Sequence, residues 1–543
     1  MIIDKRKKMK AGKILLLLLM LISLVDEMNS QVQLEWVARY NGPSNFSEYV
    51  SAMTIDSMGN IYVTGEDNEQ PYGFVTVKFN SSGQFVWARR YSGGLAIKAT
   101  PKSIAVDLQG NVYVGASDVD YIVVKYDVDG VEQWVKKYRG SGTGMNEIVD
   151  LVIDYTENVN VLVTGSSDNI ISTRDIGTLK YSTNGDTLWT RNFSRLNNTL
   201  EWATAMDIDN FNALSIAGDT KLSMQSKDFL TLSYDYYGNL RWAQTFDGPA
   251  SRWDEASDIA SDKNGNVYVT GYATMDSLNA INIATIKYNS SGNEQWVRFY
   301  EGTFPYYYSE GRFIKIDPYY NIVTAGWQAG YNYDFCTIKY DSLGNQLWVK
   351  GYNGAANAED FLEGLAVDKY GDIYVTGSAK DEINRPKITT IKYDKGGNQV
   401  WLQKYPDSDS ISYPKGIIVD KDLNVYVAGI SFNPSDIIVL KYSQPTSVVP
   451  ILSEVPDGFQ LYQNYPNPFN SKTNIKYQIT NSSFLRIKVY DVFGREVATL
   501  VNEKKEPGEY QVEWDAEGLA SGLYYYRIIS GRYIETKKAL LIK

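Results

Sequence analysis

The sequence predicts an all-β fold, a ring of four-stranded repeats followed by a small β-sandwich. Three observations lead to this prediction. The 543 residues are too many for one ordinary hydrophobic core, so the chain needs several domains or a repeat architecture. Its apolar runs are short and rich in Val, Ile, Thr and Tyr, which strands prefer. A pattern centred on tryptophan also recurs eight times along the chain.

The first 30 residues resemble an export signal. Basic residues between Lys5 and Lys13 precede an apolar run from Ile14 to Val25. A run of about twelve residues is too short to span a bilayer. We therefore expect residues 1–30 to act as a signal peptide, and the mature protein to have no transmembrane helix.

The repeats occupy residues 31–443. Their clearest marker is a tryptophan that recurs every 47 to 55 residues: Trp36, Trp87, Trp134, Trp189, Trp242, Trp296, Trp348 and Trp401. Two further markers keep this period, an Asp-x-x-Gly-Asn turn, as at Asp56 to Asn60, and a Lys-aromatic pair, as at Lys78-Phe79. A period near fifty with several short strands predicts the blades of a β-propeller. We expect the repeated tryptophans to pack between blades rather than to bind a ligand.

Ring closure follows from the count of markers. Trp36 precedes the first turn, whereas the last unit, Asp420 to Tyr442, has no tryptophan strand after it. The amino-terminal strand should therefore complete the final blade, which removes two free sheet edges and gives eight blades. The alternative is seven blades with one degenerate unit displaced, and the weakest unit surrounds Asp209.

The repeat motif resembles a known family. The Asp-x-x-Gly-Asn turn and the Tyr-Val-Thr-Gly strand, found at Tyr62 to Gly65, Tyr268 to Gly271 and Tyr374 to Gly377, are similar to the bacterial β-propeller repeat (SBBP). The resemblance covers roughly residues 34–443 and implies an extracellular propeller. Because members of this family share no single activity, it implies a fold more than a function.

The period stops after Tyr442. Residues 444–458 contain Pro445, Pro450 and Pro456 and predict a semi-stiff linker. Residues 459–543 alternate strands and turns, so we expect a small immunoglobulin-like β-sandwich.

This last segment resembles the type A sorting domain of the type IX secretion system. The resemblance rests on Tyr465, Pro466, Asn467, Pro468, Phe469 and Asn470, on Gly494 and Arg495, and on Trp514-Asp515 and the Lys537-Lys538 run. It implies recognition by the type IX secretion machinery and a final location at the cell surface or in the medium. We expect no catalytic role for this domain.

Composition excludes several kinds of chemistry. The chain has no histidine and one cysteine, Cys336, so intramolecular disulfides, Cys/His zinc sites and histidine-based triads are ruled out. Cys336 lies among apolar strand residues, which predicts a buried, inert thiol. Residues 31–458 carry 35 basic and 52 acidic residues, a net charge of −17, which argues against nucleic acid as a partner and tolerates cations.

Candidate site residues lie in the long connections between repeats. A carboxylate recurs seven or eight residues before the turn aspartate, at Glu48, Glu147, Glu201, Asp254, Glu310 and Asp360, whereas two units have Ala99 and Ser412 there. These acids either cap the start of the inner strand or form a ring that could hold Ca²⁺ or another cation with oxygen ligands. No other cofactor is indicated.

Aromatic residues in the same loops leave two functions open. The side chains that could stack on sugar rings, or cover the blade ends, are Trp253, Trp327, Tyr306, Tyr307, Tyr308, Tyr331 and Tyr333. We favour a secreted or cell-surface scaffold that binds an extracellular glycan or protein. The alternative is a secreted carbohydrate-active enzyme that uses carboxylates of the long-loop face.

Overall fold

The computed structural model describes two compact units, within residues 1–445 and 446–543, and each is considered by itself. The described residues are 32–93, 98–142, 144–155, 159–168, 173–196, 199–221, 226–276, 280–302, 308–330, 332–405, 411–432, 435–444, 460–479, 483–492, 495–505, 508–530 and 533–543. All regular secondary structure within these ranges is β. The predicted signal peptide and nearly all of the predicted linker lie outside them.

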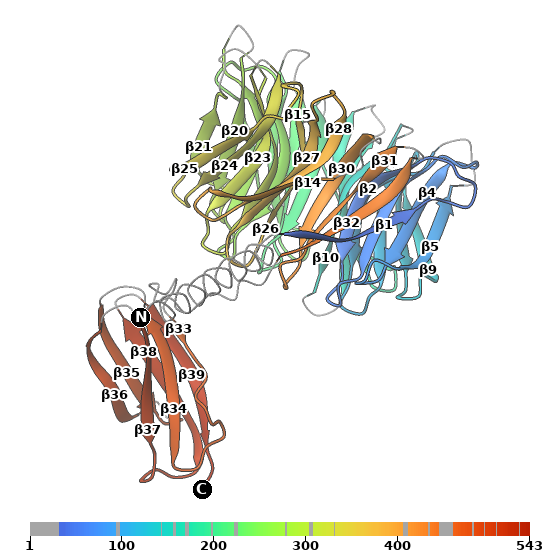
Figure 1. Ribbon diagram of the computed structural model, residues 1–543. Coiled ribbons are helices and arrows are strands. Elements are labelled where there is room, and N and C mark those ends of the chain that lie inside the picture. The colour runs from blue at the N-terminus through green and yellow to red at the C-terminus, as the bar shows by residue number, and fades with distance from the viewer. Residues whose placement is uncertain are drawn as a thin grey trace, which may run out of the picture. The chain divides into compact units, whose positions relative to one another are not determined.

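The first unit consists of four-stranded antiparallel sheets (Figure 1). The first four sheets contain β2 (Glu48–Ile55), β3 (Ile61–Asp67), β4 (Gly73–Phe79) and β5 (Phe85–Ser92); β6 (Thr100–Val106), β7 (Val112–Ser117), β8 (Tyr121–Tyr126) and β9 (Glu132–Tyr138); β10 (Glu147–Asp154), β11 (Asn160–Asp168), β12 (Arg174–Ser182) and β13 (Thr187–Phe193); and β14 (Leu200–Ile208), β15 (Leu214–Lys221), β16 (Asp228–Tyr234) and β17 (Leu240–Phe246). One parallel bridge, Arg174 to Leu200, joins the last two of these sheets.

The remaining sheets of this unit follow the same order. They contain β18 (Glu255–Ser261), β19 (Val267–Thr274), β20 (Ile281–Tyr288) and β21 (Glu294–Tyr300); β22 (Glu310–Ile316), β23 (Ile322–Ala329), β24 (Tyr333–Tyr340) and β25 (Gln346–Tyr352); β26 (Phe361–Val367), β27 (Ile373–Lys380), β28 (Pro386–Tyr393) and β29 (Gln399–Lys404); and β30 (Ile411–Val419), β31 (Val425–Phe432), β32 (Asp436–Ser443) and β1 (Gln33–Tyr40).

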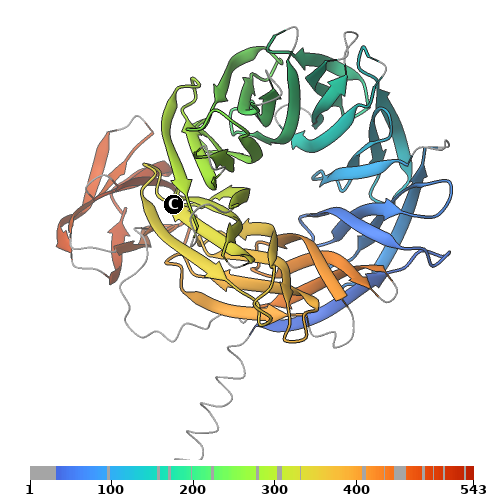
Figure 2. The same cartoon turned by 90° about the horizontal axis from the view of Figure 1, so that it is seen from above.

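The sheets form a closed ring (Figure 2). The first strand of each sheet contacts the first strand of the next, from β2 to β6 and onward to β30, and β30 contacts β2. The amino-terminal strand β1 pairs with β32, with Gln33 opposite Ser443, as the sequence predicted. One sheet therefore combines the two ends of the repeat region.

The Asp-x-x-Gly-Asn motifs form the tight turns between the first two strands of a sheet. In the first turn, Asp56 Oδ1 accepts hydrogen bonds from the backbone N–H groups of Met58 and Asn60, both over 2.9 Å. Gly59 has a φ of 81°, a conformation that glycine adopts without steric cost. The aspartate thus closes the hairpin and fixes the register of the two strands.

The repeated tryptophans pack between neighbouring sheets, as predicted. Trp242 of β17 lies against Gly292 in the turn between β20 and β21, where an added Cβ would be 2.6 Å from the indole. The Trp242 Nε1–H group donates to the carbonyl of Ser290 over 3.2 Å. The same contact with a turn glycine recurs for Trp36, Trp87, Trp134, Trp189, Trp296 and Trp348. These side chains therefore join the sheets and are not a ligand platform.

The single cysteine is part of the core. Cys336 of β24 is fully buried, and burial raises the pKa of its thiol well above the usual range. The prediction that this thiol is buried is confirmed, and its inertness stays a prediction.

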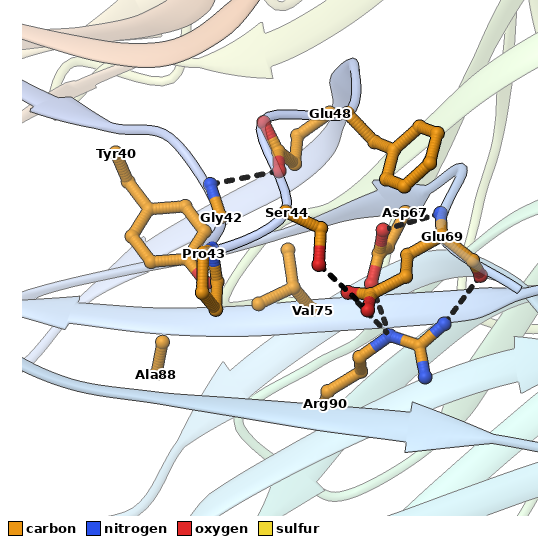
Figure 3. A pocket seen from close by; sticks show the side chains of 11 residues that line it. Tyr40, Gly42, Pro43, Ser44, Glu48, Asp67, Glu69, Val75, Ala88 and Arg90 are labelled. Atoms are coloured by element: carbon orange, nitrogen blue, oxygen red, sulfur yellow. Dashed lines mark hydrogen bonds and ion pairs between the residues drawn. The ribbon is translucent and has the colours of Figure 1, made fainter.

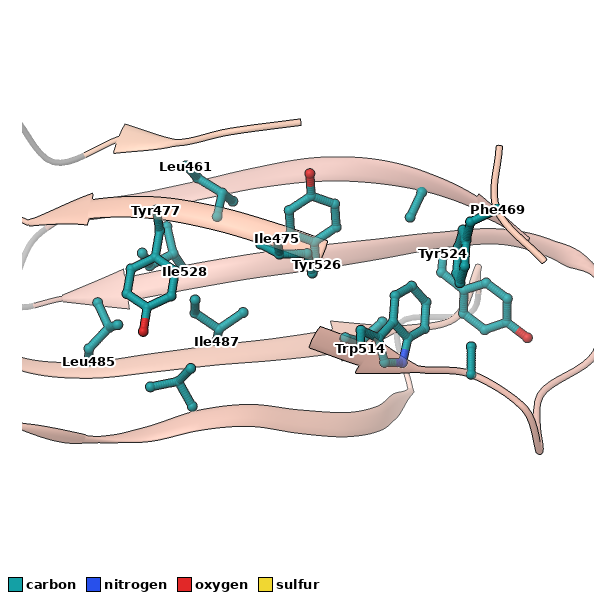
Figure 4. Close-up of a cluster of buried hydrophobic side chains, with 14 of the residues drawn as sticks. Leu461, Phe469, Ile475, Tyr477, Leu485, Ile487, Trp514, Tyr524, Tyr526 and Ile528 are labelled. Carbon is teal, nitrogen blue, oxygen red and sulfur yellow. The ribbon is translucent and has the colours of Figure 1, made fainter. Parts of the chain in front are cut away.

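The second unit has two antiparallel sheets around one core (Figure 4). One contains β33 (Gln460–Leu461), β34 (Lys472–Ile479) and β37 (Gly508–Asp515); the other contains β35 (Ser483–Tyr490), β36 (Glu496–Lys505), β38 (Gly522–Ser530) and β39 (Tyr533–Leu541). Ile475 and Trp514 from the first sheet pack with Ile487 and Tyr526 from the second. Burial of these side chains between the sheets stabilises the unit.

Candidate binding face

The six predicted carboxylates fall in two registers of the inner strands. Each inner strand has one bulged residue, such as Ser51 in β2, where pairing with the next strand shifts. The residue three positions before the bulge is acidic in four sheets: Glu48, Glu201, Asp254 and Asp360. Glu147 and Glu310 stand one residue later, and Asn146 and Ser309 take the shared position in their sheets. Because side chains alternate along a strand, Glu147 and Glu310 lie on the other side.

The acids of the first register are buried and bonded to the loop that precedes their strand or to the next strand of their own sheet. Gly42 N–H donates to Glu48 Oε1 over 2.9 Å, and Gly248 N–H donates to Asp254 Oδ2 over 2.5 Å. Asp360 accepts equivalent bonds from the backbone N–H groups of Gly354 and Lys380. Glu201 accepts a bond from Thr220 Oγ1 over 3.1 Å. Burial raises the pKa of Glu48 to about 7 and of Asp254 to about 6.

A second acid faces each of these four carboxylates across the junction between sheets. These facing residues come from the third strand of the preceding sheet. Burial together with the neighbouring carboxylate raises the pKa of one or both members of each pair. The pairs are Asp436 with Glu48, Asp175 with Glu201, Asp228 with Asp254, and Asp334 with Asp360.

The group around Asp254 has the donor set that suits a calcium ion. Carboxylate oxygens of Asp228, Asp247 and Asp254 all lie within 4.8 Å of one another. Calcium prefers oxygen ligands and accepts several carboxylates in a flexible geometry. Within the described part of the chain, Asp254 is thus the predicted acid that lies with two further carboxylates at ligand spacing.

A series of aromatic and charged side chains crosses the long-loop edge from β14 to β23. We call it the mouth cluster, and its members are Trp202, Asp219, Lys227, Glu255, Tyr272, Tyr308, Glu310, Arg312 and Trp327. Its first half centres on Lys227, whose Nζ lies 2.9 Å from Asp219 Oδ2 and 3.1 Å from Glu255 Oε1. The same ammonium lies 5.3 Å from the centroid of the Trp202 ring. Burial, and after it the nearby Glu255 carboxylate, raises the pKa of the Tyr272 hydroxyl, so Tyr272 continues the series.

The second half of the mouth cluster continues through Tyr308. The rings of Tyr272 and Tyr308 are 5.3 Å apart, and the Tyr308 hydroxyl donates to Glu310 Oε2 over 2.5 Å. Arg312 lies 3.0 Å from Glu310 Oε1, and its guanidinium lies 5.2 Å from the centroid of the Trp327 ring. The cluster therefore combines half-buried aromatic faces with acid–cation pairs.

The carboxylates of this cluster already have partners. Asp219 Oδ1 accepts a hydrogen bond from Ala256 N–H over 2.8 Å, its other oxygen pairs with Lys227, and burial raises its pKa to about 7. Aromatic faces beside hydrogen-bonding groups suit stacking on sugar rings and contacts with hydroxyls. Sequence reasoning identified Tyr308, Glu310 and Trp327 but missed Trp202, Asp219 and Lys227, because these residue types occur once at their repeat positions.

The other loop aromatics are less closely associated with this cluster. Trp253 is 43% exposed, and Lys221 lies over its ring at 5.1 Å from the centroid. Tyr333 lies 6.3 Å from Tyr308, ring to ring. Tyr306, Tyr307 and Tyr331 lie outside the described residues.

A second group of acids, on the inner strands, was not anticipated. Asp258 Oδ2 accepts a hydrogen bond from Ile314 N–H over 2.8 Å, and Asp207 Oδ2 accepts one from Ser261 N–H over 2.6 Å. Asp150 makes the corresponding contact with Met206 N–H over 3.2 Å. Asp258, followed by the weaker influence of Asp207 and Asp150, raises the pKa of Lys315. Each aspartate thus ties its strand to the next inner strand.

A pocket of about 170 Å³ lies beside Glu48 (Figure 3). Ser44 Oγ donates to Glu69 Oε1 over 2.7 Å, and Arg90 pairs with Asp67. The first contact links the loop after β1 to the loop after β3, and the second links β5 to the end of β3, so these polar groups hold the pocket walls in place. Oε2 of Glu48 is buried without a partner.

The sorting-motif residues divide between core and surface in the second unit. Phe469 is buried and its ring lies 5.1 Å from that of Trp514, whereas Tyr465 is 81% exposed. Pro466, Asn467, Pro468 and Asn470 are exposed as well. Asn467 Oδ1 accepts a hydrogen bond from Leu540 N–H over 2.8 Å, and Arg495 pairs with Asp491 at 2.7 Å. Gly494 lies outside the described residues.

Comparison with family models identifies both parts of the chain. Residues 463–543 match the secretion system C-terminal sorting domain. Residues 86–117, 250–279 and 352–383 match the beta-propeller repeat. The chain thus contains beta-propeller repeats and a carboxy-terminal sorting domain. Its sorting domain indicates export by type IX secretion to the cell surface or the extracellular space.

Similar proteins add little about the ligand. An uncharacterized WD repeat-containing protein of Acanthamoeba polyphaga mimivirus is 23% identical over 460 residues, which are 74% of this chain but 30% of that protein. The chain therefore spans less than a third of the length of this relative.

Solved structures with a similar arrangement have low sequence identity. The WD40 domain of SCAP from fission yeast is 9% identical, with a TM-score of 0.44 and coverage of 77% of this chain and 99% of that chain. A protein of unknown function from Dyadobacter fermentans is 10% identical, with a TM-score of 0.38 and coverage of 76% and 99%. Among the described residues, no helix is long and apolar enough to cross a membrane.

Proposed function

We propose that this protein is an exported, eight-bladed propeller that acts as a binding or adhesion scaffold outside the cell. A signal peptide in residues 1–30 would direct the chain across the inner membrane. The carboxy-terminal domain, an immunoglobulin-like sandwich in this proposal, would then direct it across the outer membrane. The match of residues 463–543 to the sorting domain supports the export step of this proposal.

Export can be tested by moving the sorting domain. In a bacterium with type IX secretion, the chain that lacks residues 463–543 should stay in the periplasm, whereas the full chain should reach the surface or the medium. A periplasmic reporter that gains residues 459–543 should be exported as well. Equal export of the full and truncated chains would contradict the assignment.

We further propose that the mouth cluster binds an extracellular glycan. The aromatic rings of Trp202 and Trp327 are half-buried, and the acid–cation pairs beside them offer both donors and acceptors to hydroxyl groups. An enzyme is the weaker alternative, because Asp219, Glu255 and Glu310 are each occupied by a cation, an amide or a tyrosine. No pair of free carboxylates is evident in the described part of this cluster.

A glycan array probed with the full chain tests this second step. Glycans that the parent chain binds on the array should no longer be bound when Trp202→Ala and Trp327→Ala are combined. Tyr237→Ala is the matched control, because Tyr237 is 70% exposed on a short turn at the opposite edge of its sheet. If the double variant binds as the parent does, the mouth cluster is not the glycan site.

A further inference from the structure

One turn aspartate lacks the partners that its counterparts have. In the first sheet, Asp56 Oδ2 accepts hydrogen bonds from Asn60 Nδ2 over 2.7 Å and from the Tyr62 hydroxyl over 3.0 Å. Lys78, opposite Tyr62 in the next strand, places its ammonium 5.1 Å from the centroid of that ring. Asparagine, tyrosine and lysine thus surround this oxygen.

Sheets that lack the tyrosine use the lysine directly. Leu162 and Val323 stand at the tyrosine position of their sheets, each opposite the lysine. In these two sheets the ammonium reaches the aspartate itself, with Lys180 Nζ 2.7 Å from Asp154 Oδ2 and Lys339 Nζ 2.8 Å from Asp317 Oδ2. An alkylammonium group is therefore a partner that this carboxylate position accepts within the same protein.

The sheet of β14 to β17 has lost all three partners. Ala213, Ser215 and Ser233 occupy the positions of the asparagine, the tyrosine and the lysine. Asp209 keeps only the two turn hydrogen bonds to Oδ1, from Phe211 N–H over 2.8 Å and Ala213 N–H over 2.9 Å. Asp209 is buried, with 8% of its surface exposed. Among the described residues, no donor reaches its Oδ2.

A pocket of about 370 Å³ lies beside Asp209 and Ala213. Its lining includes Asp209, Asp235, Tyr236, Arg241 and Ser290. Elsewhere the lysine ammonium also bonds a carbonyl of the next sheet, as Lys287 does with Ser342 over 2.8 Å. In the sheet of β14 to β17, Arg241 Nη2 donates instead to the equivalent carbonyl, that of Ser290, over 2.9 Å. The carbonyl is thus satisfied, whereas the carboxylate of Asp209 is not.

We propose that this pocket binds a primary alkylammonium group, such as a lysine side chain of a partner protein or a free diamine. The pocket lies where other sheets place the ammonium group of their own lysine side chain. The lining carries two carboxylates, those of Asp209 and Asp235, and one guanidinium, that of Arg241, so it favours a cation. A cationic ligand would form with Asp209 the kind of ion pair that Lys180 forms with Asp154. The site lies on the short-turn edge and does not depend on glycan binding or on export.

Calorimetric titration of the full chain with n-butylammonium tests the proposal. We expect saturable binding at one site, and no binding of n-butanol, which has a similar shape but no charge. Asp209→Asn should weaken binding at least tenfold while nearly preserving volume. Asp262→Asn is the matched control and should bind normally, because Asn266 and Tyr268 occupy the pairing oxygen of Asp262.

A second variant supplies the missing side chain. Ser233→Lys should abolish n-butylammonium binding and raise the melting temperature, since the new ammonium would pair with Asp209. Comparison of cadaverine with a peptide that carries one lysine then distinguishes the two sources of the group. Absence of binding to the parent chain, or binding by Asp209→Asn at full strength, would overturn the proposal.

Discussion

Replacement of Trp242 by alanine should loosen the ring as a whole. The indole is 9% exposed, lies against Gly292 of the next sheet and donates a hydrogen bond to Ser290 O over 3.2 Å. Its ring is also 5.8 Å from that of Tyr288. Truncation of a buried tryptophan to alanine costs about 3–5 kcal/mol, which includes the cavity that it leaves. For a cooperative unit of roughly 400 residues, this corresponds to a fall in melting temperature of about 4–6 °C.

Differential scanning calorimetry of the full chain measures this effect. Trp253→Ala is the control, because Trp253 is 43% exposed and its loss should cost less than about 1 kcal/mol. If the two variants melt at the same temperature, Trp242 does not join the sheets as the structure indicates.

The contact between Trp242 and Gly292 can also be isolated. A Cβ on Gly292 would lie 2.6 Å from the indole, and the φ of 82° disfavours any side chain. Gly292→Ala should therefore destabilise the parent strongly and the Trp242→Ala variant less, since the indole clash is gone. Additive effects would show that the strain is only in the backbone.

Three further predictions follow from the charged groups. Lys339→Met should lower the free energy of unfolding by denaturant by about 3–5 kcal/mol, because it removes the ion-pair partner that lies 2.8 Å from the buried Asp317. Lys287→Met should lower it by about 1 kcal/mol, since the ammonium of Lys287 donates a hydrogen bond to a carbonyl. Equal losses would contradict this difference. Burial raises the pKa of Glu48 to about 7, so the free energy of unfolding should fall as pH rises from about 4.5 to about 7, and Glu48→Gln, but not Glu132→Gln, should reduce that fall. Millimolar Ca²⁺ should raise the melting temperature relative to EDTA if it binds at Asp228, Asp247 and Asp254, and this shift should persist in Glu147→Gln but vanish in Asp228→Asn/Asp247→Asn; a shift that survives the double substitution would place the ion elsewhere.

Periodic features of the fold were predictable from the sequence. The turn aspartates, the glycines with positive φ and the tryptophans recur at one spacing, so one repeat describes the others. The pairing of β1 with β32 also followed, because Trp36 had no turn before it and Tyr442 no tryptophan strand after it. Local sequence and global topology agree at these positions.

The candidate site was only partly predictable. Counting back from the turn aspartate placed Glu147 and Glu310 with Glu48, but the β-bulges show them to be one residue out of register. A shift of one residue changes the face on which a strand side chain lies, and sequence spacing alone did not fix it. The facing acids, such as Asp436 and Asp228, come from another strand of a neighbouring sheet, so no linear pattern connects them with Glu48 or Asp254.

Differences between repeats indicate where binding can be located without loss of the fold. The contact between tryptophan and glycine recurs from Trp36 to Trp348, so a change in any copy acts on sheet packing. Lys227 has no such copies, and Asp209 is a repeated turn aspartate whose neighbouring residues differ from those of its counterparts. At Asp209 three substitutions together remove the ring, the amide and the ammonium that elsewhere fill the space, yet the turn hydrogen bonds to Oδ1 remain. The hairpin therefore keeps its geometry while one carboxylate oxygen becomes available to a ligand. For this reason Asp209→Asn should leave the melting temperature of the free protein nearly unchanged, whereas Asp317→Asn should lower it, because it breaks a buried ion pair.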